Sequence, residues 1–314
     1  MILVITHKSD FTADFLINKL NEREILYYRL NCEDISINTQ ISLSSESNFL
    51  PVIDGRSKFS AVWFRRTKLP EVEGIDQYVE AYYLSELKWF QKNLWNTIEA
   101  RWISEPDSVY RAENKFLQLK TAQRIGFTVP ATLISADVHQ VHEFFDDNDG
   151  QVIIKPIYNN RFESKSTSQL IYTTKISKTE IGNMLESLPL PSIYQKYVEK
   201  KLEIRVTVIN DKVFSASVDS QQNEMTKVDW RRERLPFTPY SLPQIVQNKC
   251  VDLVKALNLS FGAIDLIETP EGEYVFLEIN PNGQWAWIEM DTGLPISDSI
   301  IDFLINGMTA GYVV

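Results

Sequence analysis

Apolar and polar positions alternate along the first third of the chain with two different periods. Short apolar runs predict strands, whereas apolar residues three and four positions apart predict helices. In chain order the predicted elements are a strand at Ile2–Thr6, a helix at Phe11–Leu20, strands at Ile25–Leu30 and Ala61–Phe64, and a long helix through Tyr78 and Leu94. Strands that alternate with helices are typical of a mostly parallel sheet. Residues 1–104 are therefore expected to form an α/β domain that ends before Glu105-Pro106-Asp107.

Two further units follow the same reading. Residues 105–191 are expected to form a small central subdomain, with a helix that starts near Lys115 and is stopped by Gly126, a strand at Val152, and a helix from Lys178 to Leu188. A polar hairpin around Arg161–Gln169 is a candidate lid, although a flexible surface loop would look the same. Residues 192–314 are expected to hold further strands, a helix at Leu242–Leu257 and a closing helix at Ser297–Leu304.

A predicted hairpin near the end of the chain carries candidate metal ligands. Its strands run through Phe261–Ile267 and Phe276–Asn280, joined by a turn at Thr269–Gly272. Side chains alternate across a strand, so Glu278 and Asn280 should share one face, while Leu277 and Ile279 point into a core.

The turn length sets the register of that hairpin. A four-residue turn would place Asp265 opposite Phe276 and diagonal to Glu278. Carboxylate and amide oxygens without His or Cys suit a hard ion such as Mg²⁺, which proteins usually share with nucleotide phosphates. An amphipathic hairpin with a merely wet polar face explains this segment alone equally well.

Charged residues inside apolar strands point to an anionic ligand. Lys155 follows the apolar run Val152–Ile154, where a charge is costly unless an anion such as phosphate meets it. Further on, the strand from Ser192 leads into a short charged linker, and in the next strand Glu203 and Arg205 share one face.

The order of these residues resembles the nucleotide and magnesium pattern of ATP-grasp ligases, over about two thirds of the chain. The resemblance implies an ATP-grasp fold of class α/β (α+β), with an N-terminal pre-ATP-grasp domain, a small central lid subdomain and a C-terminal subdomain. It also implies the cofactors ATP and Mg²⁺. The roles it implies are phosphate contacts for Lys115 and Lys155, adenine contacts along the linker of Gln195, Lys196, Tyr197 and Val198, ribose contacts for Glu203, and Mg²⁺ ligation by Asp265, Glu278 and Asn280.

Four other segments resemble a narrower family, the microviridin-type macrocycle ligases or graspetide synthetases. They are Leu3–Thr6, Val62–Arg66, Val228–Arg231 and Asn280–Trp285. This likeness implies a ribosomal precursor peptide, with leader and core, as substrate. Asp or Glu side chains of the peptide would be activated by ATP as acyl phosphates, with ADP and phosphate as products, and joined to Thr or Ser as esters or to Lys as amides. A homodimer is also implied.

Two arginines and an asparagine complete the candidate site. Arg205 can reach the γ-phosphate or the acyl phosphate with a planar fork of donors. Arg231 lies in a basic run that is usually a surface salt-bridge cluster, but the narrower resemblance assigns it to the substrate carboxylate. Asn282 follows the metal ligands and can position phosphate or substrate. Arg65 and Arg66, at a strand end, could contact substrate, but strand ends often carry solvated charge, and both are left out of the site.

Composition limits the alternatives. The net charge of −10 argues against a nucleic-acid partner. No apolar run reaches the roughly 18 residues of a membrane span, and the first residues lack a signal peptide, so a cytoplasmic location is expected. Cys32 and Cys250 show no paired spacing, which argues against a redox function. Two other functions stay open: an ATP-grasp ligase that adds an amino acid to a small molecule or a protein terminus, and a nucleotide-binding regulatory module without ligation.

Overall fold

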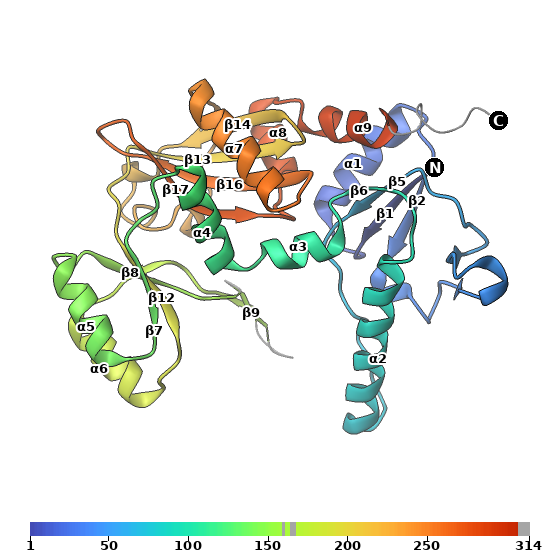
Figure 1. Ribbon diagram of the computed structural model, residues 1–314, viewed down its shortest axis with the longest axis horizontal. Helices are drawn as coiled ribbons and strands as arrows, with labels where there is room; N and C mark the ends of the chain where they lie inside the picture. The colour runs from blue at the N-terminus through green and yellow to red at the C-terminus, as the bar shows by residue number, and fades with distance from the viewer. Residues whose placement is uncertain (159–160, 164–167, 307–314) are drawn as a thin grey trace.

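The computed structural model describes residues 1–158, 161–163 and 168–306 (Figure 1), and the side chains of 161–163 and 168–170 are not described. Its first sheet has the strand order β2-β1-β5-β6, all parallel, which confirms the predicted sheet type. Its strands are β1 (Ile2–Thr6), β2 (Tyr27–Asn31), β5 (Ala61–Phe64) and β6 (Arg101–Ile103). Strand β1 is buried along its whole length because strands flank it on both sides and helices cover it.

Helices α1 (Phe11–Glu22) and α2 (Gln77–Trp95) are the two helices expected in this part of the chain. Each begins at an aspartate, Asp10 or Asp76, whose side chain accepts hydrogen bonds from backbone N–H groups of the first turn. Helix α2 extends away from the sheet (Figure 1). The segment between β2 and β5 holds the short elements η1 (Cys32–Asp34), β3 (Ile41–Ser42), η2 (Ser45–Ser47) and β4 (Val52–Ile53).

The central sheet has the order β11-β8-β12-β7. Helices α5 (Val138–Asp147) and α6 (Lys178–Ser187) cover it through a separate small core that includes Val141, Val152 and Ile181. Its strands are β7 (Thr132–Ser135), β8 (Val152–Lys155), β11 (Thr174–Lys175) and β12 (Ser192–Lys196). Strand β12 follows the predicted boundary at residue 191 and completes this sheet. Of the candidate lid, strands β9 (Arg161–Glu163) and β10 (Ser168–Leu170) pair antiparallel, and residues 164–167 lie outside the described residues.

The third sheet is antiparallel, in the order β15-β14-β13-β16-β17. Helix α4 (Lys115–Ile125), which Gly126 ends with a positive φ, packs against β17 and against α7 (Gln244–Ala256). The strands are β13 (Leu202–Ile209), β14 (Lys212–Val218), β15 (Thr238–Pro239), β16 (Phe261–Glu268) and β17 (Tyr274–Asn280); the other helical elements are α3 (Pro106–Ala112), η3 (Ser220–Gln222), η4 (Trp230–Arg232), α8 (Ala286–Thr292) and α9 (Ile296–Asn306).

The first domain and the end of the chain share one hydrophobic core. Ile2, Trp63, Trp285 and Ile300 are all less than 3% exposed and belong to the same cluster. Helix α9 packs on β5 and β6, and α8 packs on α1. The turn that follows β17 is therefore held between the third sheet and the N-terminal domain. In the described part of the chain, no helix is both long and apolar enough to cross a bilayer.

Candidate active site

The hairpin of β16 and β17 differs from the predicted register in two ways. The turn holds five residues, since the N–H of Thr269 donates to the carbonyl of Glu273 and Glu268 pairs with Tyr274. A β-bulge then inserts Leu277, because Leu266 pairs with Phe276 but Asp265 pairs with Glu278. The expected pairing of Asp265 with Phe276 is wrong, and Asp265 lies directly opposite Glu278.

The bulge also corrects the orientation expected for Leu277. This side chain is only half-buried and lines a small cavity together with Glu278, whereas Ile279 is 1% exposed and in the core as expected. A bulge turns two successive side chains toward similar directions, which strict alternation does not allow.

Three oxygen-bearing side chains meet at this point. Asn280 donates from its amide nitrogen to Asp265 Oδ2 at 3.2 Å, which leaves the amide oxygen as an acceptor. Arg205 Nε lies 3.1 Å from Asp265 Oδ1, without the alignment of a hydrogen bond. Among the described residues no three His, Cys, Asp or Glu side chains gather into a metal cluster. The candidate site consists instead of two carboxylates and one amide.

The two carboxylates have opposite pKa shifts. Burial favours the neutral form of both groups. For Glu278 the cations Lys115, Lys155, Arg231 and Arg205 outweigh burial and lower the pKa. For Asp265 burial and the charge of Glu278 outweigh Arg205 and raise the pKa. One carboxylate therefore holds its charge firmly while its neighbour is destabilised by that charge, an arrangement that a divalent cation would relieve.

Both predicted phosphate-binding lysines lie at this site. Lys115, the first residue of α4, lies with its Nζ 3.5 Å from Glu278 Oε2 and donates to the carbonyl of Pro156 at 3.3 Å. Burial lowers the pKa of Lys155 to about 8, and Glu278 partly offsets this effect. Lys155 comes from β8 of the central sheet, so the two lysines approach Glu278 from different parts of the chain.

A small cavity lies between the central sheet, α4 and β17. Its volume of about 10 Å³ is roughly that needed for one water molecule. Its lining comes from α4, β8, β12 and β17 and consists of Lys115, Gln118, Leu119, Lys155, Ile193, Gln195, Leu277 and Glu278. A nucleotide can enter here only if the side chains that line the cavity move apart.

The linker predicted to contact adenine, Gln195–Val198, begins at the edge of this cavity, which Gln195 lines. Gln195 is 2% exposed; its amide nitrogen donates to Thr132 Oγ1 at 3.0 Å, while its Oε1 is buried with no hydrogen-bond partner among the described residues. The backbone N–H groups of Lys196 and Tyr197 are taken by Ala131 and Gln151, and in the described part of the chain Val198 N–H has no such bond. An orphaned buried acceptor and a free N–H fit the edge of a purine.

Glu203, the predicted ribose contact, is 8% exposed and forms an ion pair with Lys200 at 2.8 Å. Lys200, which the sequence analysis did not single out, also donates to the carbonyl of Val228 at 3.0 Å. It therefore joins the predicted nucleotide segment to the loop that carries Arg231.

Arg231 is only partly solvated, with its side chain 32% exposed. Its guanidinium donates to both oxygens of Asp229, at 2.8 and 2.6 Å, and Asp229 is 4% exposed. This pairing and the nearby acids Glu278 and Asp265 raise the pKa of Arg231 against the effect of burial. Arg231 thus lies within electrostatic range of Glu278 and Asp265.

The interpretation of Arg65 as solvated charge is wrong. Its side chain is 1% exposed and forms an ion pair with Asp10 at 3.2 Å. It also donates to the backbone carbonyls of Asn282 and Gly283. The position at a strand end gave no sign of this burial, because the partner residues lie 55 to 219 positions away in sequence.

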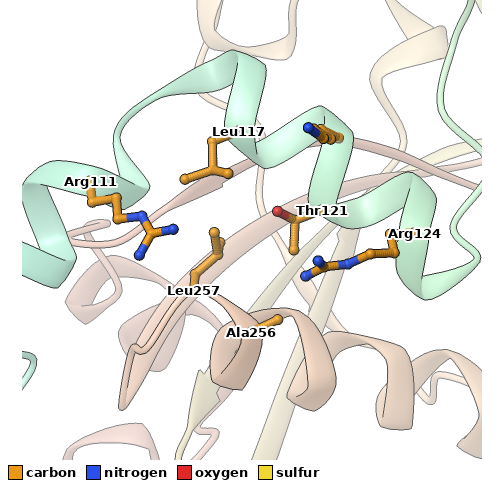
Figure 2. A pocket seen from close by; sticks show the side chains of 7 residues that line it. Arg111, Leu117, Thr121, Arg124, Ala256 and Leu257 are labelled. Carbon is orange, nitrogen blue, oxygen red and sulfur yellow. The ribbon is translucent and has the colours of Figure 1, made fainter.

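A second cavity, of about 170 Å³, lies between α3, α4 and α7 (Figure 2). None of the predicted site residues lines it. Figure 2 shows Arg111 and Arg124 reaching toward it from α3 and α4, above Ala256 of α7 and Leu257, which directly follows that helix. Its size alone does not make it the active site, because the carboxylates and the orphaned acceptor lie elsewhere.

Comparison with known proteins identifies the class. A model of the RimK-like ATP-grasp domain matches residues 112–304, and a model of the MvdD pre-ATP-grasp domain matches residues 1–110. The chain belongs to the RimK-like ATP-grasp family, which confirms the predicted fold and makes the chain an ATP-grasp ligase with an N-terminal pre-ATP-grasp domain.

Two solved structures extend the likeness over nearly the whole chain. One is a RiPP-associated ATP-grasp ligase from Chryseobacterium gregarium in complex with ADP and a leader and core peptide. It is 26% identical, with a TM-score of 0.87, and the match covers 97% of this chain and 96% of that one. The other is macrocyclase MdnC from Microcystis aeruginosa bound with precursor peptide MdnA, 25% identical, with a TM-score of 0.84 and coverage of 98% and 100%.

A curated relative represents another activity of the family. Tetrahydromethanopterin:alpha-L-glutamate ligase from Methanocaldococcus jannaschii is 22% identical over 211 residues, which are 65% of this chain and 70% of that protein. It thus matches a smaller part of the chain than the peptide ligases do.

Proposed function

We propose that this chain is an ATP-dependent macrocycle ligase that activates Asp or Glu side chains of a ribosomal precursor peptide and joins them to Thr or Ser as esters or to Lys as amides. The observation that carries the proposal is the convergence of Asp265, Glu278 and Asn280 with Lys115 and Arg205 at one point. Whole-chain similarity to proteins that bind precursor peptides supports the substrate class.

The chemistry explains why such a site needs both acidic and basic side chains. A carboxylate is a poor electrophile, and its condensation with a hydroxyl or an amine is uphill in water. ATP with Mg²⁺ supplies the phosphoryl group that converts the carboxylate into an acyl phosphate. The oxygens of Asp265, Glu278 and Asn280 are the donor set that Mg²⁺ prefers, and they would hold it.

The chain's own residues divide the remaining work. Lys115 and Lys155 would neutralise phosphate charge, and Arg205 would stabilise the charge that spreads over the transferred oxygens. Gln195 Oε1 and the N–H of Val198 fit the adenine edge. Lys196 and Tyr197, which belong to the same linker, would contact the adenine as well. Glu203 would accept from the ribose hydroxyls. Arg231, whose guanidinium is oriented by Asp229, would bind the peptide carboxylate. Asn282 would help to position that carboxylate.

The same proposal places the protein in the cytoplasm, where ATP and newly made peptide are both present. The buried thiols of Cys32 and Cys250, which form no disulfide, suit a reducing compartment. The chain is expected to form a homodimer. Its expected partner is the precursor peptide, and no nucleic acid or membrane partner is expected.

Mass spectrometry tests the proposal directly. The purified chain is incubated with a candidate precursor peptide, ATP and Mg²⁺, and a short Thr- and Glu/Asp-rich peptide encoded beside the ligase is the first choice. The peptide should lose one water per ring and release one ADP per ring, and fragmentation should locate the new bonds.

The likeness to the glutamate ligase favours a second candidate function, the addition of an amino acid to a small molecule or a protein terminus. The same experiment can detect it. A substrate that gains the mass of an amino acid, with the precursor peptide unchanged, would favour that function. ATP binding without ADP formation on any acceptor would instead favour a regulatory module.

A further inference from the structure

Arg65 directly follows strand β5 and lies at the boundary between the first domain and the C-terminal sheet. Its side chain is 1% exposed, and its ion-pair partner Asp10 is fully buried. Asp10 is itself fixed, because it accepts from Thr6 Oγ1 and from the N–H groups of Thr12 and Ala13 at the start of α1.

Every N–H of the Arg65 guanidinium has an acceptor. Nε and one Nη2 hydrogen go to Asp10, and the second Nη2 hydrogen goes to Gln284 Oε1. The two Nη1 hydrogens go to the backbone carbonyls of Asn282 and Gly283, each at 3.4 Å. A guanidinium has five N–H donors and a lysine ammonium has three, so only arginine can make this set.

The turn that Arg65 holds is the continuation of the candidate metal strand. Gly283 N–H donates to the carbonyl of Asn280 at 3.1 Å. A Cβ on Gly283 would lie 2.4 Å from the Cβ of Ala263, which pairs with Asn280 in the sheet. The turn therefore packs on the same sheet face as Asp265 and Asn280, and Arg65 fixes it from the other side.

We propose that Arg65 is a positioning residue for the metal site, through which the first domain sets the placement of Asn280 and Asn282. This inference rests on the metal assignment in the proposed function. The hydrogen bonds around Asp10 fix the guanidinium at the start of α1, and the two Nη1 hydrogen bonds connect it to the turn. Residues behind metal ligands typically change metal affinity about 10- to 100-fold when altered.

The test measures Mn²⁺ binding by electron paramagnetic resonance, with a nonhydrolysable ATP analogue present, so that no turnover is needed. The variant is Arg65→Lys, which keeps a positive charge beside Asp10 but cannot serve all five acceptors. The matched control is Leu20→Ala, a fully buried apolar change in the same domain that lowers stability without touching the turn. Arg65→Lys should weaken Mn²⁺ binding about tenfold or more, whereas Leu20→Ala should bind Mn²⁺ as the wild type does.

Two further variants keep the outcomes separate. Gln284→Ala removes one Arg65 acceptor and should weaken Mn²⁺ binding in the same direction; if Arg65→Lys does not fold, unchanged Mn²⁺ affinity of Gln284→Ala overturns the proposal. Glu278→Gln tests the metal assignment alone. Should Glu278→Gln lose Mn²⁺ while Arg65→Lys keeps it and merely melts earlier, as Leu20→Ala does, Arg65 is a structural residue only. Unchanged binding in Glu278→Gln would overturn the metal site itself.

Discussion

Lys115 Nζ and Glu278 Oε2 lie 3.5 Å apart and form an ion pair between the start of α4 and the bulge of β17. The pair is partly buried, with side chains 19% and 27% exposed. Since Lys115 is expected to contact phosphate and Glu278 to bind the metal, both partners of this pair would find new partners on the nucleotide. The ion pair thus keeps each charge compensated until the ligand arrives.

Glu278→Gln is expected to abolish Mg²⁺-dependent turnover while the chain stays folded. The amide keeps the size of the side chain but removes the charge that a divalent cation needs, so the ring-forming rate should fall about a hundredfold or more. Peptide dehydration measured by mass, together with a thermal melt, checks this. Glu271→Gln, in the exposed turn of the same hairpin, serves as control; normal ligation by Glu278→Gln would remove the metal assignment.

Affinity for ATP is expected to fall as the pH rises past about 8. The pKa of Lys155 is lowered to about 8 by burial, and lysine is a cation only below its pKa. Phosphate binding favours the cation, so the dissociation constant of an ATP analogue should rise about tenfold between pH 7 and pH 9. Titration calorimetry across this range measures it. Lys155→Arg, which stays charged, should remove the slope, and equal slopes in both proteins would exclude Lys155 as the cause.

The two site arginines are expected to fail in different ways. Arg205→Ala should stop both peptide dehydration and ADP formation, because Arg205 lies beside Asp265 among the phosphate-binding groups. Arg231→Ala should bind ATP with near-normal affinity yet lose ring formation by about a hundredfold, since its fork is assigned to the peptide carboxylate. Arg234→Ala, 83% exposed in the same run, is the control. Rings formed at the wild-type rate by Arg231→Ala would end that assignment.

Gly283→Ala is expected to destabilise the chain by steric conflict. The new Cβ would lie 2.4 Å from the Ala263 Cβ and 3.3 Å from the Asn280 carbonyl oxygen. Overpacking of this kind costs about 1–3 kcal/mol, a fall of a few degrees in melting temperature. Differential scanning calorimetry measures the loss, and a second change, Ala263→Gly, should restore part of it. If the double variant is no more stable than Gly283→Ala, the close contact is not the cause.

Local sequence patterns were enough to predict most elements of the first domain. Strands β1 and β5 have the predicted bounds, and α1 and α2 differ by few residues. These elements carry their own signals, namely apolar runs for the strands and apolar residues three and four positions apart for the helices. Strand β2 is shifted by two residues at its start from the prediction, because its side chains are mostly half-buried and its pattern is correspondingly weaker.

The details that position the site depended on contacts that no local pattern contains. The turn after Glu268 and the bulge at Leu277 changed the partner of Asp265 from Phe276 to Glu278. The turn and the bulge each add one residue, so together they move the partner of Asp265 by two positions and keep Glu278 and Asn280 on its face; strand alternation contains no sign of either. Arg65 and Lys200 were missed for a related reason. A charged residue is interpreted as solvated until its distant partner is known, and for Lys200 that partner is the carbonyl of Val228, 28 positions away.

The guanidinium of Arg65 has a consequence for how such ligases can be recombined. The regions matched by the two family models, residues 1–110 and 112–304, look like exchangeable modules. Arg65 and Asp10 belong to the first region. Gln284 and the carbonyls of Asn282 and Gly283, to which Arg65 donates, belong to the second. A chimera that joins the first module to another ligase would leave a buried charge facing a foreign turn. Successful grafts should therefore transfer Asp10, Arg65 and Gln284 as one inherited set.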